Sequence, residues 1–109
     1  MNINFSVSDG VSILNYCDIS KGGSSYGNVI VAGGSNLTIS NCNIQNSATN
    51  GISLLNYSNP IISNCVVSNN LNHGIVLTDA DPDIIDCTIF SNGQYGIFVN
   101  DIYGNLTIS

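Results

Sequence analysis

The sequence predicts an all-β fold, a right-handed parallel β-helix of about four coils in which three short parallel sheets surround a narrow core. One observation is a repeated phrase, which reads Ile-Ser-Asn-Cys-Val-Val at residues 62–67 and Ile-Ser-Asn-Cys-Asn-Ile at residues 39–44. Another is the regular interval, 22 to 25 residues, that separates the four cysteines Cys17, Cys42, Cys65 and Cys87. A repeat of this length indicates a stacked architecture.

Each repeat contains three short apolar segments, which in the second repeat are residues 37–40, 42–44 and 52–54. Apolar residues alternate within each segment, and alternation is the period of a β-strand. Strands this short cannot make a sheet by themselves, but each can pair in parallel with its equivalent one repeat later, about 4.8 Å away. The chain then winds as a solenoid, and the crossover rule for parallel strands makes it right-handed.

The first bend of each repeat lies inside the repeated phrase. The alternation slips by one residue there, so the chain must turn while the residues on both sides still point inward. Asn41 and Asn64 occupy the bend in two repeats, and Tyr16 and Asp86 occupy it in the others. Asn tolerates the left-handed backbone conformation better than other side chains. Stacked Asn amides can also hydrogen-bond from coil to coil.

A glycine precedes the third strand of every repeat, at Gly27, Gly51, Gly74 and Gly96. We expect a turn with positive φ at these positions, because glycine adopts that conformation at no steric cost.

The 109 residues have room for one domain, residues 1–109. Residues 1–11 fit the repeat poorly and form either the end of a preceding coil or a cap. Residues 106–109 begin a further copy of the phrase, so we expect the chain to be a fragment of a longer repeat protein. An uncapped solenoid exposes its core and an unpaired strand edge, and we therefore expect copies to associate end to end as a homo-oligomer.

The charge balance excludes several classes of partner. One basic residue stands against seven acidic ones, for a net charge of −6. Binding to nucleic acid or to an anionic membrane needs clusters of Lys and Arg, so neither is expected. The apolar runs are too short to insert into a membrane, and no signal peptide is visible.

The four cysteines could form a metal site or disulfides, or they could be ordinary core residues. Successive sulfurs are about one strand spacing apart, so the four cannot converge at about 2.3 Å on a single zinc ion. Parallel strands in register also hold neighbouring Cβ atoms side by side, which fits the disulfide dihedral poorly. We expect a stack of buried thiols that fills a small core position.

Asp79, Asp81 and Asp101 are the candidate metal ligands. Asp79 and Asp101 each follow the glycine of their repeat by five residues, so they should lie on adjacent coils. Close carboxylates can bind Ca²⁺ together with backbone carbonyls, or act as an acid and its partner in glycoside cleavage. The alternative is a solvated acidic loop, because the pattern lacks the Gly and Glu of a helix-loop-helix calcium site. The expected cofactor is therefore none or Ca²⁺.

The candidate ligand-binding residues are aromatic. Tyr26, His73 and Tyr95 each stand immediately before a glycine of the glycine column, and Phe98 lies close behind. Aromatic rings at coil spacing can form a ledge on which sugar rings stack. The alternative is that flanking loops fold over these rings.

The outward positions of the third strand form a mainly apolar stripe of Ile30, Ser53, Val76 and Phe98. A contiguous exposed apolar strip usually marks a contact surface. The alternative is that the flanking loops fold over the stripe. None of these four side chains is titratable.

Residues 59–65, 62–67 and 72–77 resemble the repeats of the pectate-lyase-like superfamily of parallel β-helices, and the resemblance covers roughly residues 12–109. It implies the right-handed β-helix and an asparagine ladder at the Asn41–Asn64 bend. The superfamily includes pectate lyases, polygalacturonases, alginate epimerases, phage tailspikes and bacterial surface proteins. It therefore implies an extracellular or cell-surface location, whereas function must be argued from a site.

Enzymes of that superfamily carry acids, or an Arg or Lys base, on the outer face of the third strand and on its flanking loops. The outer face has no titratable group here, and Lys21 stands alone on a loop, so a lyase would lack its base. We expect a non-catalytic module that binds polysaccharide or a partner protein through its loops. The alternatives are part of a lyase, hydrolase or epimerase that uses Asp79, Asp81 and Asp101, and a structural spacer or assembly unit.

Overall fold

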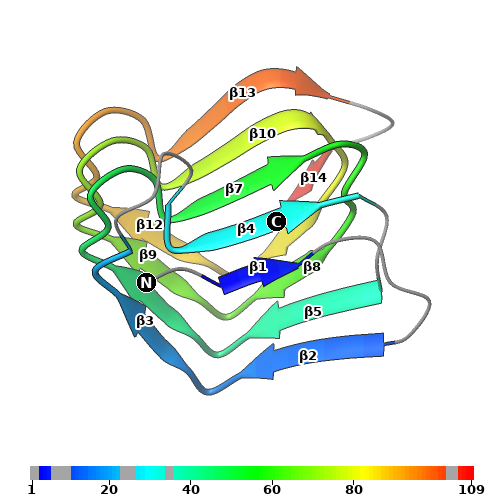
Figure 1. Ribbon diagram of the computed structural model, residues 1–109, viewed down its shortest axis with the longest axis horizontal. Coiled ribbons are helices and arrows are strands. Elements are labelled where there is room, and N and C mark those ends of the chain that lie inside the picture. Colours follow the sequence, from blue (N-terminus) through cyan, green and yellow to red (C-terminus); the bar gives the residue numbers. More distant parts are fainter. Residues whose placement is uncertain (1–2, 6–10, 23–26, 34–35, 103–105) are drawn as a thin grey trace.

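The computed structural model describes residues 3–5, 11–22, 27–33, 36–102 and 106–109, and these residues form three parallel sheets and no helix (Figure 1). Sheet A is made of β1 (Ile3–Phe5), β4 (Val29–Ala32), β7 (Ile52–Leu55), β10 (Ile75–Ala80) and β13 (Ile97–Ile102), in that spatial order. Sheet B contains β2 (Val11–Asn15), β5 (Asn36–Ser40), β8 (Ile61–Ser63), β11 (Asp83–Ile85) and β14 (Thr107–Ile108). Sheet C contains β3 (Asp18–Ser20), β6 (Asn43–Gln45), β9 (Val66–Ser68) and β12 (Thr88–Phe90).

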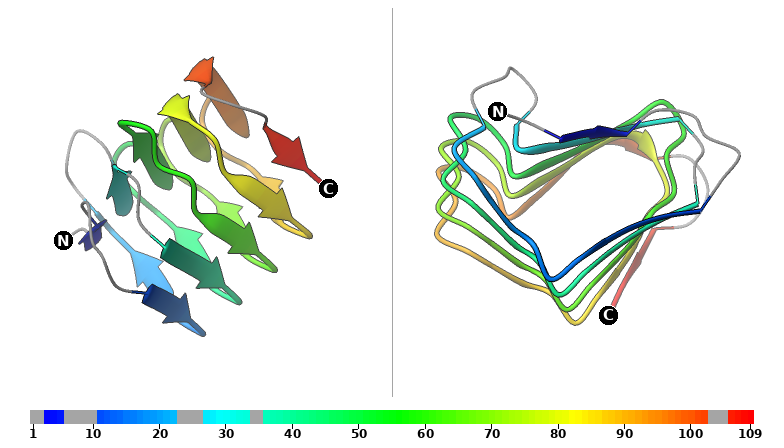
Figure 2. Two further views of the ribbon diagram at one scale, coloured as in Figure 1. Left: turned by 90° about the vertical axis from the view of Figure 1, so that its right-hand side faces the viewer. Right: turned by 60° about the horizontal axis from the view of Figure 1, so that its bottom comes forward.

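Every strand pairs with its equivalent one coil later, which confirms the predicted parallel β-helix of about four coils. In sheet B, Ile39 pairs with Ile62 and Ile62 pairs with Ile84. The view along the coils shows the three sheets as sides of one closed loop (Figure 2, right). β1 pairs with β4 in sheet A, so residues 3–5 belong to the end of a preceding coil, one of the two alternatives for this segment.

The core is the column of inward side chains between the sheets. Ile39, Ile44, Leu54, Ile62 and Leu77 have no exposed surface. Burial of an aliphatic side chain of this size contributes about 1.5–3 kcal/mol, so the stacked aliphatic residues are the main source of stability.

The bend between sheets B and C has the predicted conformation. Tyr16, Asn41, Asn64 and Asp86 have φ values of 54°, 54°, 51° and 51°. The bend is therefore left-handed in all four coils, and Asn is the side chain that tolerates it at least cost.

The hydrogen-bonded asparagine ladder lies elsewhere than predicted. At the bend, Asn41 Nδ2 donates to Asn15 Oδ1 at 3.0 Å, and no amide–amide bond joins Asn41 to Asn64 among the described residues. The ladder instead follows sheet C, where Asn70 Nδ2 donates to Asn92 Oδ1 at 2.9 Å and the Asn70 N–H donates to the same oxygen at 3.2 Å. The Asn70 amide is buried, whereas Asn41 and Asn64 at the bend are exposed.

The expectation of positive φ along the glycine column is wrong for three of its four members. Gly27 has a φ of 123°, whereas Gly51, Gly74 and Gly96 lie outside the left-handed region. Close approach explains the glycines instead: a Cβ on Gly51 would lie 2.7 Å from the carbonyl oxygen of Gly74, and one on Gly74 would meet that of Gly96. Adjacent coils pack backbone against backbone here, which leaves no room for a side chain.

Candidate functional site

Three aromatic rings stack at the start of the last two strands of sheet A. The ring centroids of His73 and Phe98 lie 4.6 Å apart with planes 9° from parallel, and those of His73 and Tyr95 lie 5.6 Å apart at 5°. Tyr95 and Phe98 lie 5.8 Å apart at 10°. Such offset stacks are each worth about 0.5–1.5 kcal/mol beyond the area that they bury. The structure thus brings together three of the four candidate ligand-binding residues, and Tyr26 lies outside the described residues.

Hydrogen bonds hold His73, the ring of the stack that belongs to the earlier coil. His73 Nδ1 accepts the backbone N–H of Tyr95 at 3.3 Å, and the backbone N–H of His73 donates to Asn50 Oδ1 at 3.1 Å. In the neutral imidazole the ring proton therefore lies on Nε2, which is a hydrogen-bond donor. The backbone beside the stack is bonded from coil to coil, because the Gly74 N–H donates to the Tyr95 carbonyl at 2.9 Å.

The ring planes lie across the solenoid axis. His73 precedes Tyr95 and Phe98 by one coil, and the 4.6 Å separation of His73 and Phe98 is close to the strand spacing of about 4.8 Å. The faces of His73 and Phe98 therefore point along the axis and cover each other. A ledge on which sugar rings stack remains a prediction. His73 is 8% exposed and Tyr95 is 60% exposed, which leaves Tyr95 as the accessible ring.

The outward stripe of sheet A is only partly exposed, which favours the alternative that it is covered over part of its length. Ile30 is 7% exposed and Ser53 is 1% exposed, although neither belongs to the central hydrophobic core. Val76 and Phe98 are half-buried. The accessible part of this face is thus confined to the last two coils, around the aromatic stack.

The three candidate acidic ligands lie near the end of sheet A opposite the stack. Asp101 pairs with Thr78 and not with Asp79, because the register of β10 and β13 shifts after Leu77. Asp79 and Asp101 therefore lie on adjacent coils, as predicted, but one residue out of register, and the left-handed φ of 53° at Asp79 accompanies the irregularity. Among the described residues no group of three or more His, Cys, Asp or Glu is placed to hold a metal ion. A calcium site remains a prediction.

The cysteines form the predicted stack of free thiols. Cys42 and Cys65 are buried, whereas Cys17 and Cys87 are half-buried. Each thiol donates to a backbone carbonyl, as Cys65 does to Ser63 at 3.2 Å. Burial raises the pKa of the Cys42 thiol, and the neighbouring Cys87 thiol together with burial raises the pKa of Cys65. These two cysteines therefore act as neutral, hydrophobic core side chains.

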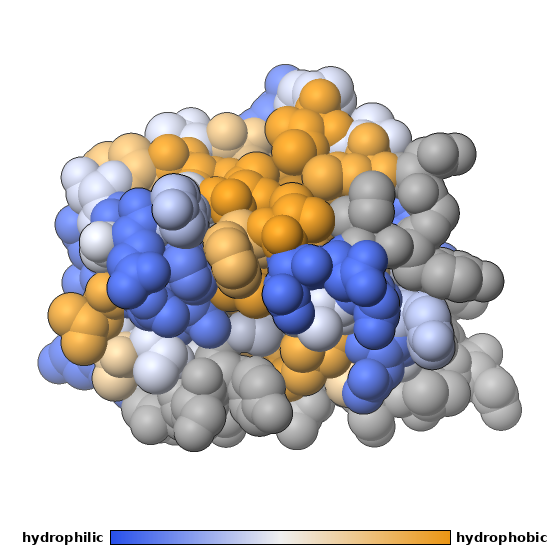
Figure 3. All heavy atoms as spheres, turned by 90° about the horizontal axis from the view of Figure 1, so that it is seen from above, coloured by the Kyte–Doolittle hydropathy of each residue, from blue (hydrophilic) through white to orange (hydrophobic). Residues whose placement is uncertain are grey.

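The last coil, at the top of Figure 1, exposes apolar side chains. Val99 and Ile108 are exposed, and Ile89, Ile97 and Leu106 are partly buried against the core. Figure 3, which views this end from above, shows hydrophobic side chains gathered at its centre with hydrophilic groups on either side. We call these five residues the apolar end.

Fold and sites together define a parallel β-helix repeat protein with a partly exposed aromatic stack. The chain belongs to the right-handed β-helix family, because the family model described as right handed beta helix region matches residues 2–109. Searches of curated proteins and of solved structures found no match. The described part of the chain has no helix long and apolar enough to cross a membrane.

Proposed function

We propose that this chain is a non-catalytic β-helix repeat module of a secreted or cell-surface protein, and that it binds polysaccharide at the aromatic stack. The observation that carries the proposal is the ring of Tyr95, which is 60% exposed and yet held parallel to two other rings. An exposed aromatic ring held in place by its neighbours loses little conformational entropy on binding.

The chemistry of the stack suits a sugar. The C–H face of a pyranose packs against an aromatic face, and its hydroxyl groups need hydrogen-bond partners around the ring. The Tyr95 hydroxyl and the side-chain amide of the exposed neighbour Gln94 are candidate partners for these hydroxyl groups. The net charge of −6 disfavours uronates, so we expect a neutral glycan.

A glycan array on the purified chain, with and without calcium, tests this function, with cleavage products followed by mass spectrometry. Retention without new products supports the binding module. If retention needs calcium, Asp79, Asp81 and Asp101 become the first residues to substitute. Cleavage products would replace the binding module with the enzyme alternative, and no retention on any glycan would contradict the proposal.

A second candidate function is end-to-end association of copies of this chain, which the apolar end favours. Val99, Ile97 and Ile108 lie at one end of the solenoid, and a second copy that stacks there would remove their apolar surface from water. Light scattering at increasing protein concentration tests it. A particle that stays monomeric at high concentration would contradict the association.

A further inference from the structure

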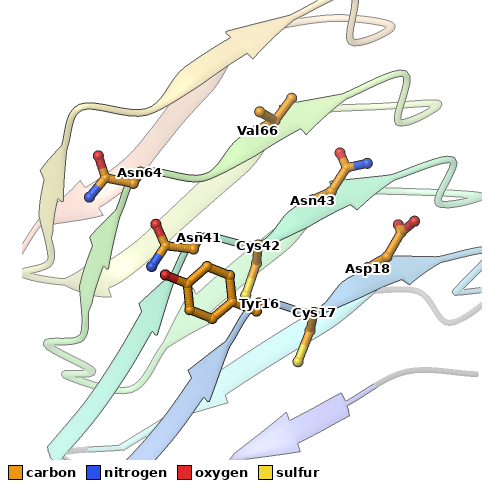
Figure 4. A pocket seen from close by; sticks show the side chains of 8 residues that line it. All are labelled: Tyr16, Cys17, Asp18, Asn41, Cys42, Asn43, Asn64 and Val66. Carbon is orange, nitrogen blue, oxygen red and sulfur yellow. The ribbon is translucent and has the colours of Figure 1, made fainter.

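A shallow hollow of about 390 Å³ lies at the bend between sheets B and C, away from the aromatic stack (Figure 4). The bend residues Tyr16, Asn41 and Asn64 form one side of it, and the other side is formed by Asp18, Asn43 and Val66. Cys17 and Cys42 lie between these two rows in the close-up view. We call this hollow the corner groove.

The two rows are in register along the solenoid. Asp18 pairs with Asn43 in β3 and β6, and Asn43 pairs with Val66 in β6 and β9. The backbone under the groove is also bonded from coil to coil, since the Asn43 N–H donates to the Cys17 carbonyl at 2.9 Å. The groove therefore presents one pair of side chains per coil on a rigid frame, at intervals of about 4.8 Å.

The polar groups of the corner groove mix donors and acceptors. A carboxamide supplies two N–H donors and a carbonyl acceptor, and a carboxylate supplies acceptors. Asn41 uses one N–H on Asn15 at 3.0 Å. Within the part of the chain that the structure describes, the side chains of Asp18, Asn43 and Asn64 make no hydrogen bond, so their polar groups face water.

An aromatic ring completes the lining. Tyr16 is 80% exposed, although Asn or Asp occupies its position in the other three coils. Asn and Asp suit the left-handed bend, and a bulky aromatic side chain suits it poorly. The bend conformation therefore does not explain the tyrosine. Its accessible ring lies beside the groove, where a ligand could pack against it.

From these observations we propose that the corner groove is a second binding site, for a neutral, extended glycan that runs along the solenoid axis. The ring of Tyr16 packs against one sugar, and the amides of Asn41, Asn43 and Asn64 bond to hydroxyl groups of successive sugars. The strand spacing of about 4.8 Å is close to the length of one hexose unit in an extended chain, so each coil meets one sugar.

Other ligand classes fit the groove less well. The lining carries the carboxylate of Asp18 and no basic side chain, so phosphates and uronates would be repelled. A peptide that adds as a β-strand needs an open sheet edge, whereas β6 is paired on both sides, with β3 and β9. Hydroxyl-rich, uncharged rings are the class that the amides and the tyrosine ring recognise together.

The repeats of the chain supply substitutions that keep the fold. Tyr16→Asn introduces the residue found at positions 41 and 64, and Asn43→Val introduces the residue found at position 66. Tyr57→Ala, which removes an exposed ring from the turn after β7 and outside both sites, is the matched control. Each variant is checked by circular dichroism before binding is measured.

The experiment is a nuclear magnetic resonance titration of the ¹⁵N-labelled chain with linear neutral hexasaccharides of glucose, mannose and xylose. A hexasaccharide of galacturonate serves as the charge control. We expect at least one neutral sugar to shift the side-chain amide signals of Asn41, Asn43 and Asn64, and the uronate to shift none. Tyr16→Asn and Asn43→Val should each weaken that binding about threefold to tenfold, and Tyr57→Ala should leave it unchanged.

Two results would overturn the proposal: no neutral sugar shifts these amides at millimolar concentration, or folded Tyr16→Asn binds as the wild type does. The signals also separate the two sites. Shifts confined to Tyr95 and its neighbours would overturn the corner groove and leave the proposed function intact, whereas shifts confined to the corner amides would do the reverse.

Discussion

The imidazole of His73 and the phenyl ring of Phe98 stack across two coils, with centroids 4.6 Å apart and planes 9° from parallel. His73 immediately precedes Gly74 in one coil, and Phe98 is an outward residue of β13 in the next coil. The parallel register makes it possible, because Val76 pairs with Phe98 and places equivalent residues side by side. One repeat thus orients a binding residue that belongs to the next.

A pair of substitutions, one in β8 and one in β10, tests the assignment of inward and outward positions. Ile62 has no exposed surface, so Ile62→Asp should bury an unpaired charge and destabilise the fold by more than about 4 kcal/mol. Val76 is half-buried on the outer face, and Val76→Asp should leave the chain folded. Circular dichroism decides, and an unfolded Val76→Asp beside a folded Ile62→Asp would reverse the assignment.

The glycine column gives a second stability test. Gly74→Ala places a methyl group against the Gly96 carbonyl and 2.9 Å from Asn92 Nδ2. We expect a loss of about 1–3 kcal/mol in the free energy of unfolding, as for other overpacked sites. Gly96→Ala is the control, because its Cβ meets only Ile89 Cγ2, at 3.3 Å, among the described residues. Equal losses in denaturant titrations of both variants would contradict the close-approach explanation.

The inward asparagine ladder should contribute to stability through satisfied buried groups. Asn70 Oδ1 accepts the Ser47 N–H at 3.1 Å, and Asn70 Nδ2 donates to Asn92 at 2.9 Å. Asn70→Ala would leave buried partners unpaired and should cost about 1–3 kcal/mol. Exposed Asn59 provides the control in Asn59→Ala, which should change the unfolding free energy little. An unchanged unfolding free energy in Asn70→Ala would mean that the ladder does not stabilise the fold.

The buried thiols predict how stability depends on pH. Burial raises the pKa of Cys42 above the ordinary value of 9.0. The unfolded chain therefore loses this proton first as the pH rises, so the contribution of Cys42 to stability is complete below about pH 9 and falls above it. The pKa of Cys65 is raised and that of its neighbour Cys87 is lowered, so the effects of these two thiols on stability oppose each other. Urea titrations at pH 7 and pH 10 should show this loss, and Cys42→Ala should reduce it. A loss that is the same in wild type and variant would assign it to other groups.

The fold could be predicted from the sequence because every coil repeats the same pattern of apolar, bend and glycine residues. The spacing of Cys17, Cys42, Cys65 and Cys87 gives the coil length, and alternation gives the inward residues, since a strand has no other way to bury an apolar face. The left-handed bend at Asn41 and Asn64 followed from a one-residue slip in the pattern. Each of these features depends on local backbone geometry alone.

Features that depend on contacts between coils were harder to predict. The bend asparagines look like a ladder in the sequence, yet the Asn41 amide bonds to Asn15 and not to Asn64, and the inward ladder is formed by Asn70 and Asn92. Ile30 and Ser53 follow the outward alternation and are nevertheless covered. Likewise, the sequence placed His73 and Tyr95 in one column, but the direction of their ring faces depends on rotamers and on the Tyr95 N–H bond to His73.

The proposed binding of a sugar by the exposed ring of Tyr95 can be tested by removing that ring. The most direct measurement is the affinity of Tyr95→Ala, compared with Tyr57→Ala, for the glycan that the array retains. Tyr57 is 58% exposed and lies in the turn after β7, at the other end of sheet A, so its substitution removes an equally exposed ring from elsewhere. Titration calorimetry should show at least about tenfold weaker binding for Tyr95→Ala and unchanged binding for Tyr57→Ala. Equal affinities of Tyr95→Ala and the wild type would contradict the account.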